Sequence, residues 1–200
     1  MDQNILFASL IFLGYLLSSI PFGYIIARLK KIDIQKQGSG NIGGTNVFRV
    51  LGFKYAVLVA ALDVLKVLLP SLLARYYLVN EWMVSLVVLV SVLGHIFPVW
   101  LRFKGGKAVS GVFASMIAVI GWQYSLVFLL IWAVMLRMIK IMSLTNLIIV
   151  WIIPLLFYLF THSIPFTLLG LAYVPIIYWS HRENIKRLRE GTEKRIIKSS

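Results

Sequence analysis

Apolar stretches long enough to cross a lipid bilayer recur along this chain, and they limit its possible folds more than any other feature. A membrane-spanning helix needs about 20 consecutive, mostly apolar residues. Soluble domains are about 45–50% apolar and about 25% charged, whereas this 200-residue chain is 60% hydrophobic and 14% charged. We therefore predict an all-α integral membrane protein, one polytopic domain over residues 1–200. Its seven transmembrane helices are predicted at about residues 5–29, 52–74, 82–100, 108–121, 122–136, 144–160 and 165–179.

The basic residues predict how these spans are oriented. Of the 20 Lys and Arg residues, all except Lys66 and Arg75 fall on one side of the predicted topology. That side contains the polar segments 30–50 and 101–107 and the tail 181–200, and the Lys/Arg bias predicts that it is cytoplasmic. Seven crossings then place the N-terminus outside and the C-terminus in the cytoplasm. The net charge of +13 thus belongs to one face of a membrane protein, and a soluble nucleic-acid binder is excluded.

The lack of cysteine and the spacing of the acidic residues exclude several kinds of functional site. The chain has no cysteine, so it can form neither a disulfide nor a thiolate metal site, and it has no cysteine nucleophile. The acidic residues of the predicted cytoplasmic side show no spacing typical of metal ligands. We therefore predict no metal and no cofactor.

The first polar segment contains a glycine-rich motif, and residues 38–49 read GSGNIGGTNVFR. Glycines let the backbone approach an anion closely, successive N–H groups can bind it, and arginine offers phosphate a planar pair of donors. The alternative is a flexible loop between two spans. The GxGxxG pattern inside this motif does not indicate a dinucleotide site, because it follows an apolar helix rather than a strand.

A second motif comes from residues 94–98, GHIFP, followed by residues 103–107, FKGGK. Two lysines around a Gly-Gly pair suit a phosphate, because cationic groups and open backbone N–H groups lie together. The spacing does not match a Walker A loop. The alternative is a basic membrane anchor with a flexible turn, in which His95 has a structural role.

The tail carries the third motif, and residues 181–193 read HRENIKRLREGTE. On a helix that continues from the last span, His181 and Asn184 share one face and can point into a site at the membrane surface. The alternative is a basic amphipathic tail that binds anionic lipid. Within the second span, Asp63 and Lys66 lie three residues apart, and we interpret them as a structural ion pair rather than a functional site.

With these motifs, the chain resembles the bacterial membrane acyl-phosphate-dependent glycerol-3-phosphate acyltransferases. The resemblance covers nearly the whole chain and adds residues 18–24, SSIPFGY, to the three motifs above. The chain departs from the family pattern after Lys107, where Ala108 replaces an expected glycine. The resemblance implies a multi-pass protein of the bacterial cytoplasmic (inner) membrane whose active site faces the cytoplasm.

The activity implied by the resemblance is the first acylation of phospholipid synthesis. An acyl phosphate would donate its acyl group to the sn-1 hydroxyl of glycerol 3-phosphate, giving 1-acylglycerol 3-phosphate (lysophosphatidic acid) and phosphate. The expected partners are these two substrates and membrane lipids, with no nucleic acid. The oligomeric state and the acyl-chain preference are left open.

We expect direct transfer in one ternary complex, since acyl phosphate is already activated and needs chiefly orientation and charge stabilisation. The predicted catalytic residues are Ser39, Asn46, His181 and Asn184. The predicted phosphate-binding residues are Gly40, Asn41, Gly43, Thr45, Arg49, Lys104, Gly105, Gly106 and Lys107. Two alternatives stay open for the proton acceptor, His181 or the departing phosphate. Ser39 as a covalent nucleophile is a further alternative.

Two other classes of function compete with the enzyme. A small anion transporter or channel predicts midplane polar groups and related halves, but no repeat is evident in the sequence. A scaffold that binds anionic lipid leaves the three glycine-containing motifs without a role.

Overall fold

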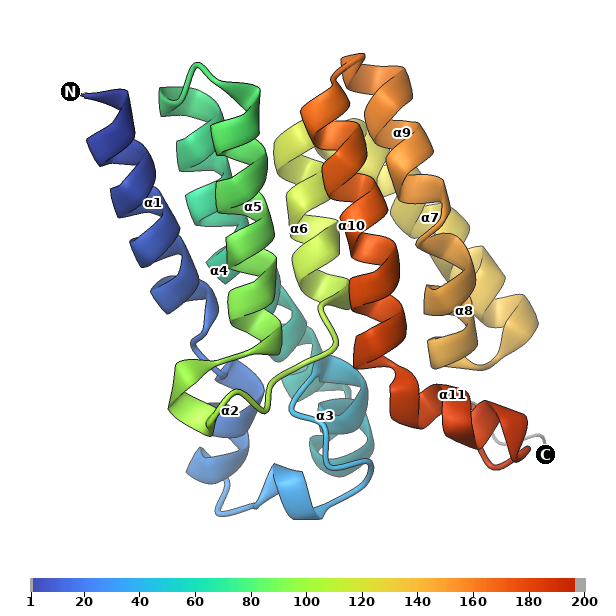
Figure 1. Cartoon of the computed structure of the whole chain (residues 1–200). Helices are drawn as coiled ribbons and strands as arrows, with labels where there is room; N and C mark the ends of the chain where they lie inside the picture. Colours follow the sequence, from blue (N-terminus) through green and yellow to red (C-terminus); the bar gives the residue numbers. More distant parts are fainter. Residues whose placement is uncertain (1, 197–200) are drawn as a thin grey trace. The chain divides into compact units, whose positions relative to one another are not determined.

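The computed structural model describes residues 2–196, and within this range it contains helices and no strand (Figure 1). Contacts divide the chain into two compact units, Met1–Ala118 and Val119–Ser200. Residues 197–200 of the predicted tail lie outside the described residues.

In the first unit, three long helices lie side by side (Figure 1). These are α1 (Gln3–Ser18), α4 (Phe53–Tyr77) and α5 (Glu81–Ile96). Small residues permit their close approach, as is typical of membrane helices. A Cβ atom added to Gly14 of α1 would lie 3.0 Å from the hydroxyl oxygen of Ser91 on α5 and 3.3 Å from Cβ of Pro70 on α4.

Shorter elements gather at one end of this bundle (Figure 1). They are α2 (Phe22–Leu29), the 3₁₀ helices η1 (Ile34–Lys36) and η2 (Val99–Leu101), and α3 (Gly44–Leu51). The helix α6 (Val109–Ile120) begins after them, and its Gly111 faces Val67 of α4 and Val92 of α5. Residues 18–24 and the first and second motifs therefore lie where the long helices of this unit end.

The break between α1 and α2 follows from the sequence SSIP at residues 18–21. Pro21 precedes the first residue of α2 and has no backbone N–H to continue α1. The carbonyl of Leu17, four residues before Pro21, accepts instead from the N–H of Ile20 at 3.2 Å. The hydroxyl of Ser19 donates to the neighbouring carbonyl of Leu16 at 2.8 Å. A serine thus supplies a hydrogen bond at this break.

The second unit consists of five helices among its described residues. They are α7 (Trp122–Ile139), α8 (Met142–Ile149), α9 (Ile152–Thr161), α10 (Ile164–Ser180) and α11 (Arg182–Arg189). A Cβ on Gly170 of α10 would lie 2.7 Å from Cα of Pro154 on α9, so these two helices pack closely. The axis bends by 42° between α8 and α9 and by 61° between α10 and α11.

The lengths of these helices support a multi-pass membrane protein. Four segments, Gln3–Leu29, Phe53–Tyr77, Glu81–Leu101 and Trp122–Ile139, are long and apolar enough to cross a bilayer. The two bent pairs raise the number to six if each pair is one span, whereas α6 is shorter than a span. Four of the seven predicted spans thus coincide with such segments, and two more do if each bent pair is one span. The fourth predicted span, like the orientation, stays a prediction.

Candidate active site

Asn46 organises the glycine-rich loop between η1 and α3. Its side chain is 1% exposed, and its carbonyl oxygen accepts the backbone N–H of Ser39 at 2.8 Å. Its amide nitrogen donates to the carbonyl of Gln37 at 3.0 Å. Gly38 has a φ of 65°, and a Cβ there would overlap the Asn46 side chain. Asn46 therefore shapes the loop and leaves Ser39 exposed, and its predicted catalytic role stays a prediction.

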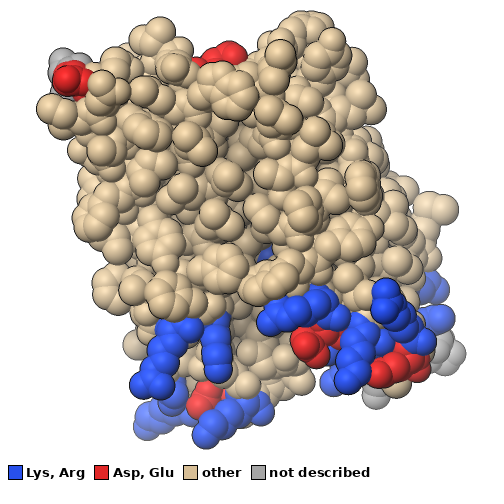
Figure 2. All heavy atoms as spheres, viewed as in Figure 1, with Lys and Arg blue, Asp and Glu red and all other residues tan. Residues whose placement is uncertain are grey.

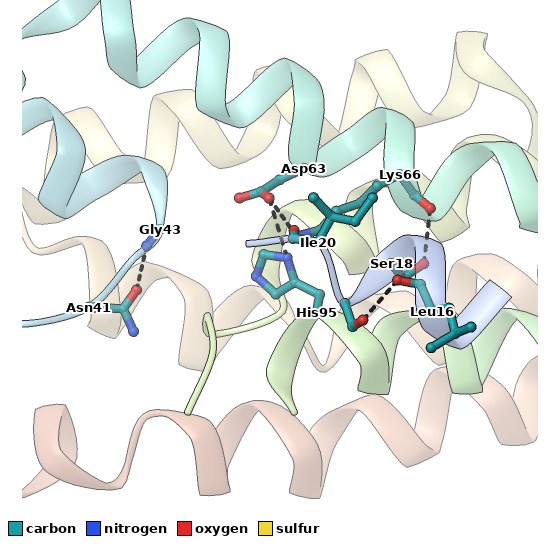
Figure 3. A network of polar contacts seen from close by, with 9 residues as sticks. Leu16, Ser18, Ile20, Asn41, Gly43, Asp63, Lys66 and His95 are labelled. Atoms are coloured by element: carbon teal, nitrogen blue, oxygen red, sulfur yellow. Dashed lines mark hydrogen bonds and ion pairs between the residues drawn. The ribbon is translucent and has the colours of Figure 1, made fainter. Parts of the chain in front are cut away.

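The glycine amides expected to bind phosphate are engaged within the chain. Each donates to an oxygen atom of the same unit at 2.8–3.1 Å. They are the N–H groups of Gly40, Gly43, Gly105 and Gly106. Figure 3 shows one of these contacts, from Gly43 to the side chain of Asn41. The glycines thus allow tight turns, and their predicted binding of phosphate stays a prediction.

Cationic side chains of the first unit gather at the end that carries its glycine-rich loop and its lysine-bearing turn (Figure 2). Arg49, in the last turn of α3, and Lys104 are exposed, and Lys107 is half-buried. Thr45 lies half-buried in the first turn of α3, and Asn41 lies half-buried in the loop before it. This arrangement can attract a doubly charged phosphate, because guanidinium and ammonium groups pair well with phosphate oxygens.

The segment around the two lysines has an unusual backbone. Three residues that are not glycine have positive φ, with 51° at Arg102, 62° at Phe103 and 65° at Ala108. Left-handed conformations of this kind cost free energy for residues with a Cβ and cluster at functional sites. Ala108 occupies the position where the sequence comparison expected glycine, and its conformation is one that favours glycine.

His181 is held firmly in the second unit. It is 1% exposed, and its Nδ1 lies 2.9 Å from the carbonyl oxygen of Ile177. A carbonyl can only accept, so Nδ1 carries a proton in this contact. The amide nitrogen of Asn146 lies 3.5 Å from Nε2, and Trp132 fixes that amide by donating to its oxygen at 2.8 Å.

The side chain of Asn184 donates a hydrogen bond to Glu193. The sequence alone predicted no role for Glu193. One Glu193 oxygen accepts from Asn184 at 2.6 Å and from Ser143 at 2.8 Å, and the other accepts from Arg187 at 2.6 Å. Burial raises the pKa of Glu193, but these donors outweigh burial and hold the pKa below its usual range. Its position inside the third motif, two residues after Gly191, was the available signal in the sequence.

The predicted site residues therefore fall into two sets. Ser39, Asn46 and the cationic residues belong to the first unit, and His181 and Asn184 belong to the second. That both sets serve one site stays a prediction. A surface hollow of about 360 Å³ along α11 contains none of the predicted residues. Among residues 2–196, no group of His, Asp and Glu could hold a metal ion.

Comparison with known proteins identifies the family. A family model described as glycerol-3-phosphate acyltransferase matches residues 8–191. The chain belongs to this family. Two members from Prochlorococcus marinus and Aquifex aeolicus, both named glycerol-3-phosphate acyltransferase, are each 41% identical to it. The first alignment covers 94% of this chain and 96% of the relative, and the second covers 93% and 97%.

Solved structures of the glycerol-3-phosphate acyltransferase family have the same fold. One is a crystal structure of PlsY (YgiH), an integral membrane glycerol 3-phosphate acyltransferase, in its glycerol 3-phosphate form. It is 36% identical, has a TM-score of 0.90 and covers 96% of each chain. The lysophosphatidic acid form of PlsY is 37% identical, with a TM-score of 0.87 and 94% coverage of each chain. The chain is thus a multi-pass membrane acyltransferase.

Proposed function

We propose that the chain transfers a fatty acyl group from an acyl phosphate to the sn-1 hydroxyl of glycerol 3-phosphate, which yields lysophosphatidic acid and phosphate. Membership of the glycerol-3-phosphate acyltransferase family is the observation that carries this proposal. It favours an enzyme over the anion transporter that the sequence alone left open. The related PlsY structures in glycerol 3-phosphate and lysophosphatidic acid forms support the acceptor and the product.

The family resemblance implies acyl phosphate as the donor, and the cationic groups of the first unit fit this donor. Arg49, Lys104 and Lys107 can neutralise phosphate groups, and Lys104 and Lys107 lie on either side of a tight glycine turn. An acyl phosphate is a mixed anhydride whose leaving group is phosphate itself, so cations at that position stabilise the charge that develops as the bond breaks. The residues described here contain no cysteine to form a thioester intermediate.

In the proposed transfer, the glycerol 3-phosphate hydroxyl attacks the carbonyl carbon of the acyl phosphate. A new ester C–O bond forms, the C–O bond to phosphate breaks, and the hydroxyl proton moves to the departing phosphate. The fixed Nδ1–H of His181 and the approach of Asn146 to Nε2 support a positioning role for this histidine. Ser39 then orients the acceptor through its exposed hydroxyl, in a loop shaped by Asn46.

The experiment is an assay of the purified protein with labelled glycerol 3-phosphate. Palmitoyl phosphate is supplied in one reaction and palmitoyl-CoA in a parallel one. We expect labelled lysophosphatidic acid with palmitoyl phosphate alone. Absence of product in both reactions contradicts the enzyme proposal, and product from palmitoyl-CoA alone contradicts the donor. A covalent acyl-enzyme trapped in the absence of glycerol 3-phosphate contradicts direct transfer.

A further inference from the structure

A buried polar network inside the first unit has no part in the reaction described so far. Asp63, Lys66 and His95 are each only 3–4% exposed. The ammonium nitrogen of Lys66 lies 2.7 Å from Oδ1 of Asp63, so the ion pair expected from their spacing is present (Figure 3). Nδ1 of His95 lies 3.8 Å from the same carboxylate oxygen. Three ionisable side chains from α4 and α5 thus meet within an apolar bundle.

Stability alone does not account for this network. Removing two charges from water costs several kcal/mol per ion, and well-packed apolar residues often serve a buried position equally well. Ionisable groups inside a membrane domain are therefore functional candidates. Among the described residues, Nδ1 of His95 has no hydrogen-bond partner. A buried polar atom left in this way beside a carboxylate calls for a role beyond packing.

The turn between Lys104 and Lys107 packs against the C-terminal end of α5, where His95 lies. The last carbonyls of a helix have no partner within it. Gly106 donates its N–H to the carbonyl of His95 at 3.1 Å, and Gly105 donates to that of Ile96 at 3.0 Å. Tyr15 donates its hydroxyl to the carbonyl of Phe97 at 2.7 Å. The end of α5 is therefore capped by the segment between Lys104 and Lys107 and by one residue of α1.

The His95 ring also touches this turn directly. A Cβ built on Gly106 would overlap Nε2 of His95, and a Cβ on Gly105 would overlap the carbonyl oxygen of His95. One edge of the imidazole thus faces Asp63, and the other lies against Gly106. The ring connects the buried ion pair to the turn that separates the two lysines.

We propose that Asp63, Lys66 and His95 form a positioning assembly for phosphate binding. Lys66 holds Asp63, the Asp63 carboxylate lies against one edge of the His95 ring, and the ring supports the Gly105–Gly106 turn that presents Lys104 and Lys107. The binding role of these lysines rests on the proposed function. The three buried residues do not touch substrate and act through the turn.

The contact between ring and turn is tested by a double-mutant cycle on His95 and Gly106. Gly106→Ala alone pushes the turn off the ring, and a displacement of about 1 Å can cost on the order of a hundredfold in rate. We expect kcat/KM for palmitoyl phosphate or glycerol 3-phosphate to fall by that order, chiefly through KM. In a His95→Ala background the overlap is gone, so adding Gly106→Ala is expected to cost less than threefold more. Losses that simply multiply would overturn the proposal.

Hydrogen exchange tests the same assembly without any assay of activity. We expect the Gly105 and Gly106 amides to exchange at least tenfold faster in His95→Ala and in the neutral pair Asp63→Leu/Lys66→Met, since each change removes support from the turn. The neutral pair leaves no unpaired buried charge, so its fold is expected to persist. Ser85→Ala, a buried polar change elsewhere on α5, is the control and leaves these amides unaltered.

The two measurements separate the inference from the proposed function. Unchanged exchange at Gly105 and Gly106 in both His95→Ala and the neutral pair overturns the positioning assembly, whatever the enzyme does. Faster exchange at these amides supports the assembly even if the wild-type protein makes no lysophosphatidic acid, in which case only the proposed function fails.

Discussion

Ala108 follows the second lysine of the FKGGK motif, is fully buried and has a φ of 65°. A left-handed conformation costs a residue with a Cβ about 1–2 kcal/mol, whereas glycine adopts it readily but loses more chain entropy on folding. The position therefore stores backbone strain immediately beside a phosphate-binding candidate.

We expect Ala108→Gly to raise the free energy of unfolding by up to about 1 kcal/mol, because relief of strain exceeds the entropy that glycine loses. The measurement is the midpoint of thermal unfolding in detergent. The control is Ala114→Gly inside α6, which is equally buried and is expected to destabilise by about 1 kcal/mol. Destabilisation by both variants contradicts strain at Ala108.

The interactions of Glu193 predict how the stability of the protein depends on pH. Its folded-state pKa lies below the usual value, so its contribution to stability is present above that value and is lost as pH falls through the folded pKa. We expect the unfolding midpoint of the wild type to fall more between pH 7 and pH 4 than that of Glu193→Gln. The neighbouring exposed Glu190→Gln serves as control and should follow the wild type. Equal slopes for all three proteins contradict this role.

At the scale of the element, a proline in α4 explains a contact between helices. Pro70 has no N–H, so the carbonyl of Lys66 four residues earlier lacks its usual partner within the helix. The hydroxyl of Ser18 at the end of α1 donates to that carbonyl at 2.9 Å (Figure 3). In return, the Lys66 ammonium donates to the carbonyl of Ile20, in the break between α1 and α2, at 2.7 Å.

We expect Ser18→Ala to cost about 1–3 kcal/mol of unfolding free energy, because it leaves a buried carbonyl unpaired. In a Pro70→Ala background, α4 supplies the missing N–H itself, and the same serine change should cost less than half as much. Unfolding of the four proteins of this cycle measures the coupling. Ser71→Ala, whose hydroxyl bonds within α4, is the matched control. Equal costs in the two backgrounds would show that Pro70 does not create the need for Ser18.

At the scale of the whole molecule, the absence of cysteine makes topology easy to test. The Lys/Arg bias predicts that Lys36 faces the cytoplasm and Tyr76 the opposite side. We expect Lys36→Cys to react with a membrane-impermeant maleimide only in inverted vesicles, and Tyr76→Cys only in right-side-out vesicles. The wild type serves as an unlabelled control. Labelling of both positions from the same side contradicts the predicted orientation.

The sequence alone was sufficient for the features that depend on local composition and spacing. Apolar length predicted the membrane helices, and the order of the three motifs predicted the acyltransferase family, which the comparisons confirm. The pairing of Asp63 with Lys66 was also predictable, because residues three apart share a helix face. In each case, the prediction depends on residue types and their spacing along the chain, and it needs no knowledge of which helices pack together.

Only the tertiary structure decided which polar atoms meet. Asn46 proved to organise a loop, four glycine N–H groups proved to be engaged, and Glu193 proved to join Ser143, Asn184 and Arg187. These partners lie up to 50 residues apart in the chain, as do Ser143 and Glu193. The physical reason is that a buried polar group takes whichever partner helix packing brings near it, and spacing along the sequence does not record that choice.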